Sequence, residues 1–173
     1  MKFPAWWEAP DEILQIDGHC GLVAAWAVLR YFGKRVSVPK LIHVCRYTQR
    51  HGVFTVTLAA GLKAHGLSVA FHSDRDTDIG GFEKRCYGYA NRLGVSPQPS
   101  VDVSYLLRER RRGRIPIVLF NTPEDNGHFS PLLGRRARML QLPLAEKGEM
   151  SEAEFLIRWS EVGILKQCVI VGG

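Results

Sequence analysis

The sequence predicts an α+β protein, with helices in its first half and most of its strands in its second half. Residues 22–32 are apolar or aromatic except for Arg30, so a helix here is buried on every face. Residues 115–120 form a continuous apolar run, which is typical of a strand covered on both sides. A chain of 173 residues suits one domain, so we expect a single domain over residues 1–173.

Turn and capping signals divide the first half of the chain. Glycine just past a periodic segment ends a helix, as Gly33 and Gly66 do, and Pro39 occupies an early helical position. Predicted helices cover residues 20–32, 41–47 and 55–65, and a strand follows at 67–71. Residues 72–100 give weaker signals and are interpreted as a helix and loop at the rim of a cleft. Trp6 and Trp7 are interpreted either as an anchor on the domain surface or as an exposed contact for a partner.

The second half contains more strand signals. Ser151 and Glu154 form a capping box that begins a helix, and Asn126-Gly127 is a strong turn signal. The predicted elements are a helix at 101–112, strands at 115–120, 128–134 and 139–144, the helix after Ser151, and a final strand at 168–171. We therefore expect the buried N-terminal helix to pack against a C-terminal antiparallel sheet.

Cys20 lies at the first turn of the buried helix. Free N–H groups and the helix dipole favour an anion there, and the thiolate is the nucleophilic form of cysteine. Gly18 and Gly21 leave room beside Cys20, and the amide of Gln15 is placed to donate to an oxyanion together with the N–H of Cys20. The alternative is a structural cysteine, because free cysteine is among the most buried residue types.

Residues 15–21, Gln-Ile-Asp-Gly-His-Cys-Gly, followed by a helix that ends in Tyr31-Phe32-Gly33, resemble the start of the C39-like cysteine peptidases. The order that follows, a short helix, a turn with glycine, a helix, a glycine and a strand, also resembles that family. In the family an aspartate precedes the cysteine, whereas this chain has His19. The resemblance implies a papain-like cysteine peptidase fold in which Cys20 is the nucleophile.

Gly127-His128-Phe129 follows an apolar strand and a polar loop, where the C39-like pattern carries its catalytic histidine. Of the six histidines, only His128 begins a strand in the second half. Imidazole titrates in the range that a base for a cysteine needs. The resemblance therefore implies that His128 activates Cys20, and the alternative is a hydrogen-bonded histidine at the rim of a cleft.

The third member of the expected triad departs from the pattern. C39-like enzymes carry an aspartate before a proline near the end of the next strand, but Leu142 precedes Pro143 here. Gln141 is one residue away and could orient His128 through its carbonyl oxygen if the strand register shifts. The further options are Asp17, Asp125, Asn126 and Glu146.

The resemblance implies a thiol-dependent peptidase or amide hydrolase that acts on a peptide or protein through a Cys-His dyad or a non-standard triad. Acyl transfer to an amine is a related reaction on the same fold. The alternative from another class is a catalytically inactive C39-like module that binds peptides or proteins, and Leu142 favours it.

No cofactor or metal is expected. The cysteines, at 20, 45, 86 and 168, show no paired spacing of the kind that zinc sites use, even with His43 or His51 added. Asp74, Asp76 and Asp78 alternate, but Glu83 comes too early to close a calcium loop.

The formal net charge is +6, and much of the excess lies in two arginine runs, at 108–114 and 135–138. Aromatic residues do not interleave these runs, so a solvated helix end and hairpin turn are favoured over a nucleic-acid partner. The sequence has neither an apolar run long enough for a transmembrane helix nor the apolar region of a secretory signal. We therefore expect a cytoplasmic protein without a membrane partner.

Overall fold

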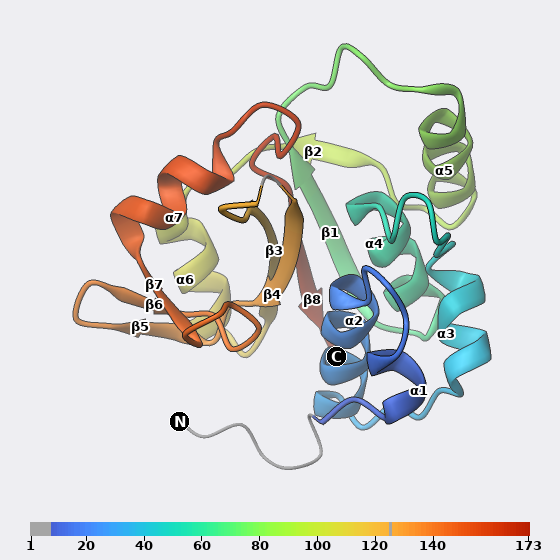
Figure 1. The fold of residues 1–173 in the computed structure, drawn as a ribbon, viewed down its shortest axis with the longest axis horizontal. Helices are drawn as coiled ribbons and strands as arrows, with labels where there is room; N and C mark the ends of the chain where they lie inside the picture. Colours follow the sequence, from blue (N-terminus) through green and yellow to red (C-terminus); the bar gives the residue numbers. More distant parts are fainter. Residues whose placement is uncertain (1–7, 125) are drawn as a thin grey trace.

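The computed structural model describes residues 8–124 and 126–173, so the predictions for Trp6, Trp7 and Asp125 fall outside the described residues. Figure 1 shows the arrangement of the helices and strands. In chain order they are α1 (Asp11–Leu14), α2 (Cys20–Tyr31), α3 (Val38–Val44), α4 (Thr55–Ala64), β1 (Ser68–Ser73), α5 (Gly81–Arg92), β2 (Pro97–Pro99), α6 (Val103–Arg111), β3 (Ile115–Asn121), β4 (Gly127–Pro131), β5 (Gly134–Arg136), β6 (Met139–Gln141), β7 (Glu149–Ser151), α7 (Glu152–Trp159) and β8 (Cys168–Gly172).

The strands form two sheets. The main sheet has five strands in the order β2-β1-β8-β3-β4, antiparallel except for the parallel pair β1 and β2. A separate three-stranded sheet contains β5, β6 and β7 and projects to one side in Figure 1. The predicted α+β architecture, with a cysteine helix and an antiparallel-rich sheet, is confirmed.

Two details of the predicted layout are wrong. First, β1 and β2 precede residue 100 but belong to the main sheet, so this sheet draws on both halves of the chain. Second, the strand predicted at 139–144 ends at Gln141 and pairs with β5 and β7 rather than joining the main sheet beside β4. Pro143 has no N–H to donate to a ladder, which fits the end of the strand before it.

The main sheet is covered on both faces, as the apolar run in β3 predicted. Ile115 and Ile117 lie in one core together with residues of α2, α3 and α4. Val118 and Phe120 point the other way, into a second core with residues of α6 and α7. Successive side chains of a strand point to opposite faces, so the apolar side chains of β3 enter the two cores in alternation.

Helix α2 is buried along most of its length, as predicted, and its first turn lies against β4. At Gly21 a Cβ atom would come within 3.0 Å of Cβ of Val53 and 3.2 Å of a ring carbon of Phe129. The absence of a side chain at Gly21 therefore allows the start of α2 to approach β4. Since β4 is the last strand of the sheet, Cys20 lies at a sheet edge.

Two helices have side-chain caps, and the one at Ser151 was predicted. The side chain of Asp102 accepts a hydrogen bond from the N–H of Tyr105 at the start of α6, and Ser151 accepts one from Glu154 at the start of α7. None of the helices in residues 8–124 and 126–173 has the length and apolar character needed to span a membrane.

Candidate active site

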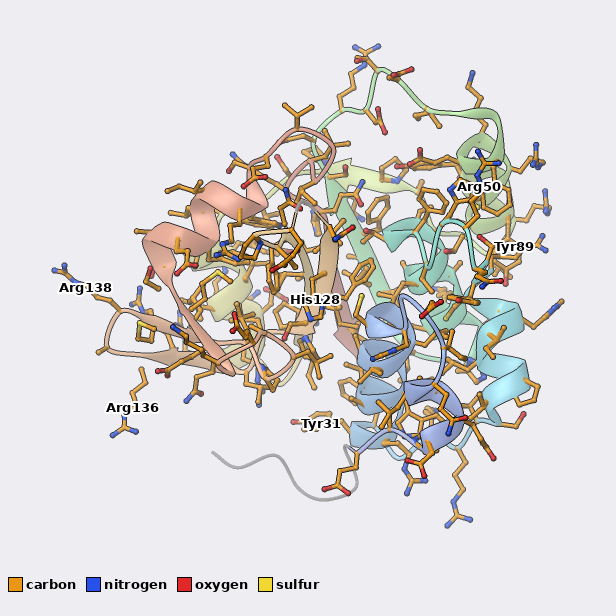
Figure 2. The ribbon with its side chains drawn as sticks, in the orientation of Figure 1. Tyr31, Arg50, Tyr89, His128, Arg136 and Arg138 are labelled. Carbon is orange, nitrogen blue, oxygen red and sulfur yellow. The ribbon has the colours of Figure 1, made fainter. Side chains whose placement is uncertain are left out.

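Cys20 and His128 line the same pocket, which has a volume of about 600 Å³. Gln49, Arg50 and His51, from the turn between Thr48 and Gly52, also line the pocket; Arg50 and His128 are labelled in Figure 2. The structure thus brings together the two residues that the sequence predicted as nucleophile and base, although they are more than a hundred positions apart.

The sulfur of Cys20 interacts with the main chain of β4. In the sheet, Leu119 is opposite Phe129, and its N–H bonds to Gln167 rather than to β4. Leu119 and Phe129 therefore form a non-hydrogen-bonded pair, and the Phe129 N–H points out of the sheet edge. This N–H, with those of Gly21 and Cys20, lowers the pKa of the Cys20 thiol.

Burial has the larger effect and raises the pKa of Cys20 above its ordinary value of 9.0. The N–H groups at the start of α2 thus favour the thiolate, but their effect on the pKa of Cys20 is smaller than that of burial. At neutral pH Cys20 is a thiol, and it needs a base when it reacts.

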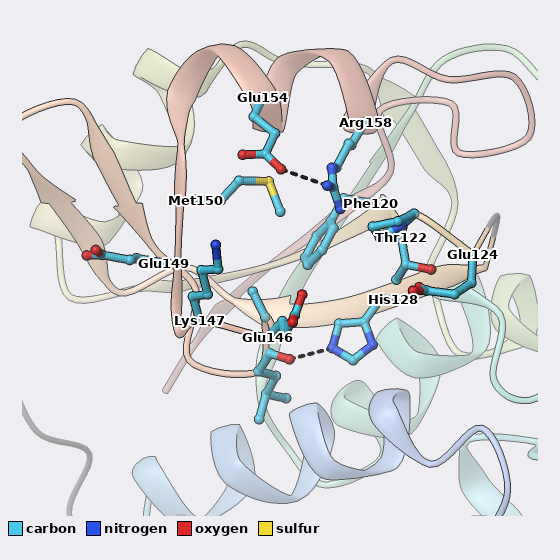
Figure 3. A pocket seen from close by; sticks show the side chains of 13 residues that line it. Phe120, Thr122, Glu124, His128, Glu146, Lys147, Glu149, Met150, Glu154 and Arg158 are labelled. Carbon is cyan, nitrogen blue, oxygen red and sulfur yellow. Dashed lines mark hydrogen bonds and ion pairs between the residues drawn. The ribbon is translucent and has the colours of Figure 1, made fainter.

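The imidazole of His128 is oriented by a main-chain carbonyl. Its Nε2 lies 2.6 Å from the carbonyl oxygen of Leu144, as Figure 3 shows. A carbonyl only accepts hydrogen bonds, so Nε2 carries the proton and Nδ1 of the neutral ring has the free lone pair. Burial lowers the pKa of His128 below 6.5, against a smaller opposite effect of the Leu144 bond. The ring is therefore neutral at pH 7 and able to accept a proton.

Ser130 holds the carbonyl of Leu144 in place. Its buried hydroxyl accepts a hydrogen bond from the Leu144 N–H at 3.2 Å. Ser130 is two residues after His128 in β4, so both side chains point to the same face of the strand. The N–H and C=O of one residue are thus fixed by β4 itself.

The residues predicted for the third position lie elsewhere. Gln141 is in β6, opposite Gly134 and Glu149. The acceptor for Nε2 of His128 is instead the carbonyl oxygen of Leu144. Leu142, where the family pattern has its aspartate, is fully buried in the second core.

Gln15 is exposed at the end of α1 and is outside the set of residues that line the pocket. Gln49 does line the pocket, from the turn opposite Cys20. Of the remaining options, Asn126 lines the same pocket, and Glu146 lines a neighbouring one together with His128.

The loop before Cys20 is anchored at three points. Nδ1 of His19 bonds to the carbonyl oxygen of Ile16 at 2.7 Å, and the hydroxyl of Tyr47 donates to the carbonyl of Asp17 at 2.7 Å. A Cβ on Gly52 would lie 3.6 Å from the carbonyl oxygen of Gly18, so the loop packs against the 48–52 turn. His19, which replaces the expected aspartate, is close enough for its charge to lower the pKa of His128.

The other cysteines have different surroundings. Cys45, Cys86 and Cys168 are buried, and burial raises the pKa of Cys45 to about 12. Cys20 alone among the four is partly exposed. Over the described residues, no three His, Cys, Asp or Glu side chains gather in a group that could hold a metal ion.

Sequence reasoning missed the Leu144 carbonyl and the 48–52 turn. Every residue carries a carbonyl, so no residue type marks the one that orients His128. The contact of Gly52 with Gly18 depends on how α2 and α3 pack. The glycines themselves, at 18 and 52, were the available signal, and both have positive φ in the structure.

The sequence matches no protein-family model, and no curated protein matches it. Among solved structures, the fold is similar to that of a candidate C39-like peptidase from Bacillus anthracis, with a TM-score of 0.61 and 14% sequence identity. The match covers 91% of this chain and 90% of the other. The resemblance seen in the sequence is therefore confirmed at the level of the fold.

Proposed function

We propose that this protein is a thiol-dependent amide hydrolase that acts on peptides, with Cys20 as nucleophile and His128 as general base. The observation that supports this proposal most is the contact between Nε2 of His128 and the Leu144 carbonyl, beside a pocket that both Cys20 and His128 line. This contact leaves the lone pair of the neutral ring on Nδ1.

In the first step Nδ1 of His128 takes the thiol proton while the sulfur of Cys20 attacks the amide carbonyl. The oxyanion that forms is stabilised by main-chain N–H groups at the first turn of α2. The imidazolium then gives its proton to the leaving amine, and a thioester remains on Cys20. Water, deprotonated by His128, hydrolyses the thioester, which releases a carboxylic acid and restores the thiol. An amine in place of water would give acyl transfer.

The Leu144 carbonyl has the role that a carboxylate or amide side chain has in a triad. It fixes the ring and stabilises the imidazolium through a hydrogen bond, but it contributes no full charge. We therefore describe the site as a Cys-His dyad with a main-chain acceptor. The missing side-chain acid is the observation that favours the second candidate, a peptide-binding module without catalysis.

Chemical labelling separates the two candidates. We would measure the rate at which a peptidyl thiol-directed inhibitor labels Cys20 at pH 7, by peptide mapping, and the hydrolysis of peptide substrates. If His128 acts as general base, His128→Ala slows labelling and turnover by about 10²–10⁴-fold. His43→Ala, at an exposed histidine of α3, is the matched control and leaves both rates unchanged.

The binding module would be supported by two results together. Cys20 would be labelled at the same rate in His128→Ala as in the unchanged protein, and the unchanged protein would hydrolyse no peptide of a diverse library. Cys20→Ala would retain peptide binding in either case, because the groove around the thiol is unchanged.

A further inference from the structure

Three pockets share lining residues around the candidate site, and we refer to them together as the groove. The pocket of Cys20 shares His128 with a pocket of about 400 Å³ between β4 and α7. On its other side it shares His51, Val53, Gly127 and Phe129 with a pocket of about 580 Å³ that extends to α5. The two neighbouring pockets are therefore within reach of a peptide that lies across Cys20.

The pocket between β4 and α7 is acidic. It is lined by Glu124, Glu146, Glu149 and Glu154 against two cations, Lys147 and Arg158. Arg158 is already paired with Glu154 at 2.7 Å. In Figure 3 the carboxylates of Glu124 and Glu146 flank the imidazole of His128 as the pocket is seen from close by. The free carboxylates are thus next to the position where a substrate would react.

The pocket on the opposite side is acidic as well. It is lined by Asp76, Asp78 and Glu83 against a single cation, Arg75. Burial, and to a smaller extent the charge of Asp76, raise the pKa of Glu83, and the N–H of Asp78 donates to a carboxylate oxygen of Asp76 at 2.9 Å. In the part of the chain that the structure describes, no three of these acids are arranged to hold a metal ion.

The central pocket has the opposite character. It is lined by Arg50 and three histidines, and no Asp or Glu is among its described lining residues. The whole chain has a formal charge of +6. Two net negative pockets on either side of the candidate nucleophile are therefore a local departure from the charge of the rest of the molecule.

We propose that the groove selects peptides that carry lysine or arginine on both sides of the amide bond held at Cys20. This inference deepens the proposed function and rests on it for cleavage, but the selection of basic peptides can be measured by binding alone. Cationic side chains that enter the two outer pockets would meet more carboxylates than cations in each, and an acidic peptide would be repelled from both.

The test uses the full chain with Cys20→Ala, which cannot cleave, and fluorescence anisotropy with three labelled peptides of equal length. One carries Lys at positions on both sides of a central Gly-Gly, one carries Glu there, and one carries Ala. We expect the Lys peptide to bind at least tenfold more tightly than the Ala peptide at 50 mM salt. This advantage falls several-fold at 500 mM salt, because exposed charges are screened.

Charge-removing variants locate the effect. Two double variants are made, Glu124→Gln with Glu146→Gln and, separately, Asp78→Asn with Glu83→Gln. Each should reduce the affinity for the Lys peptide by about 2–25-fold, because each exposed ion pair that is lost contributes a few-fold. They leave the affinity for the Ala peptide unchanged. Glu12→Gln, at an exposed acid of α1 outside the groove, changes the net charge but not the binding.

Equal affinities for the Lys and Ala peptides, or a loss that Glu12→Gln reproduces, would overturn the inference. The same peptides given to the protein with Cys20 intact separate this inference from the proposed function. If the protein binds the Lys peptide selectively but cleaves none of the peptides, the proposed hydrolase activity is contradicted and the proposed selectivity is supported. If the three peptides are cleaved at the same rate, the proposed hydrolase activity is supported and the proposed selectivity is contradicted.

Discussion

His128 and Ser130, two residues apart on one face of β4, bind the C=O and the N–H of the same residue, Leu144. The segment after Pro143 is therefore held against the strand that carries the base. The orientation of the imidazole depends on this pair of contacts rather than on a side-chain acid.

Ser130→Ala tests this arrangement. Without its hydroxyl the Leu144 peptide loses one hydrogen bond, and the carbonyl at Nε2 becomes less well fixed. We expect kcat to fall about 2–10-fold, the effect of one such bond, while KM is unchanged. The Leu144 bond raises the pKa of His128, so its weakening moves the acid limb of the pH profile to lower pH. Ser104→Ala, at an exposed serine of α6, is the control; a change in KM alone would contradict the positioning role.

The pH dependence distinguishes a neutral dyad from a preformed ion pair. His128 must be unprotonated to act as base, and its pKa is lowered, so kcat/KM should reach half its plateau below pH 6.5. The pKa of the thiol is raised above 9.0, so alkylation of Cys20 by iodoacetamide should continue to increase above pH 9. An alkylation rate that has already reached a plateau by pH 5 to 6 would instead indicate a thiolate–imidazolium pair.

Leu142 is expected to matter for stability and not for catalysis. Its side chain is fully buried in the second core, so Leu142→Ala should lower the free energy of unfolding by about 2–5 kcal/mol. Leu142→Asp, which restores the family's residue type, buries a carboxylate and should destabilise the fold without raising kcat. Urea denaturation and turnover measure the two effects, and a gain in kcat in Leu142→Asp would show that this position does reach His128.

Gly21→Ala tests the approach of α2 to β4. The added methyl group would meet Val53 and Phe129 at 3.0–3.2 Å, which should destabilise the fold by about 1–3 kcal/mol and move Cys20 away from the Phe129 N–H. The rate of Cys20 labelling should fall in the folded fraction. Gly88→Ala, in α5, where the nearest atom is an Arg92 nitrogen at 4.0 Å, is the matched control. That change should stabilise the helix by about 0.5–1 kcal/mol.

The positions of Cys20 and His128 could be predicted because both depend on local signals. Cys20 lies between a glycine turn and an apolar helix, and His128 follows a turn that precedes a strand. The partner of His128 could not be predicted, because it depends on which strands pair. The 139–144 segment has a strand pattern in either sheet, and only the pairing of β6 with β5 and β7 takes Gln141 away from β4. The segment past Pro143 then returns to His128 through main-chain atoms that have no sequence signature.

The strand order has a consequence for how the protein is made. β8, residues 168–172, is inserted between β1 and β3, so neither neighbour has its full set of ladder bonds before this strand is in place. During synthesis, α2 and β4 both leave the ribosome well before β8 does. Because long-range pairing must wait for β8, the main sheet that carries His128 would be completed only after residues 168–172 have been synthesised.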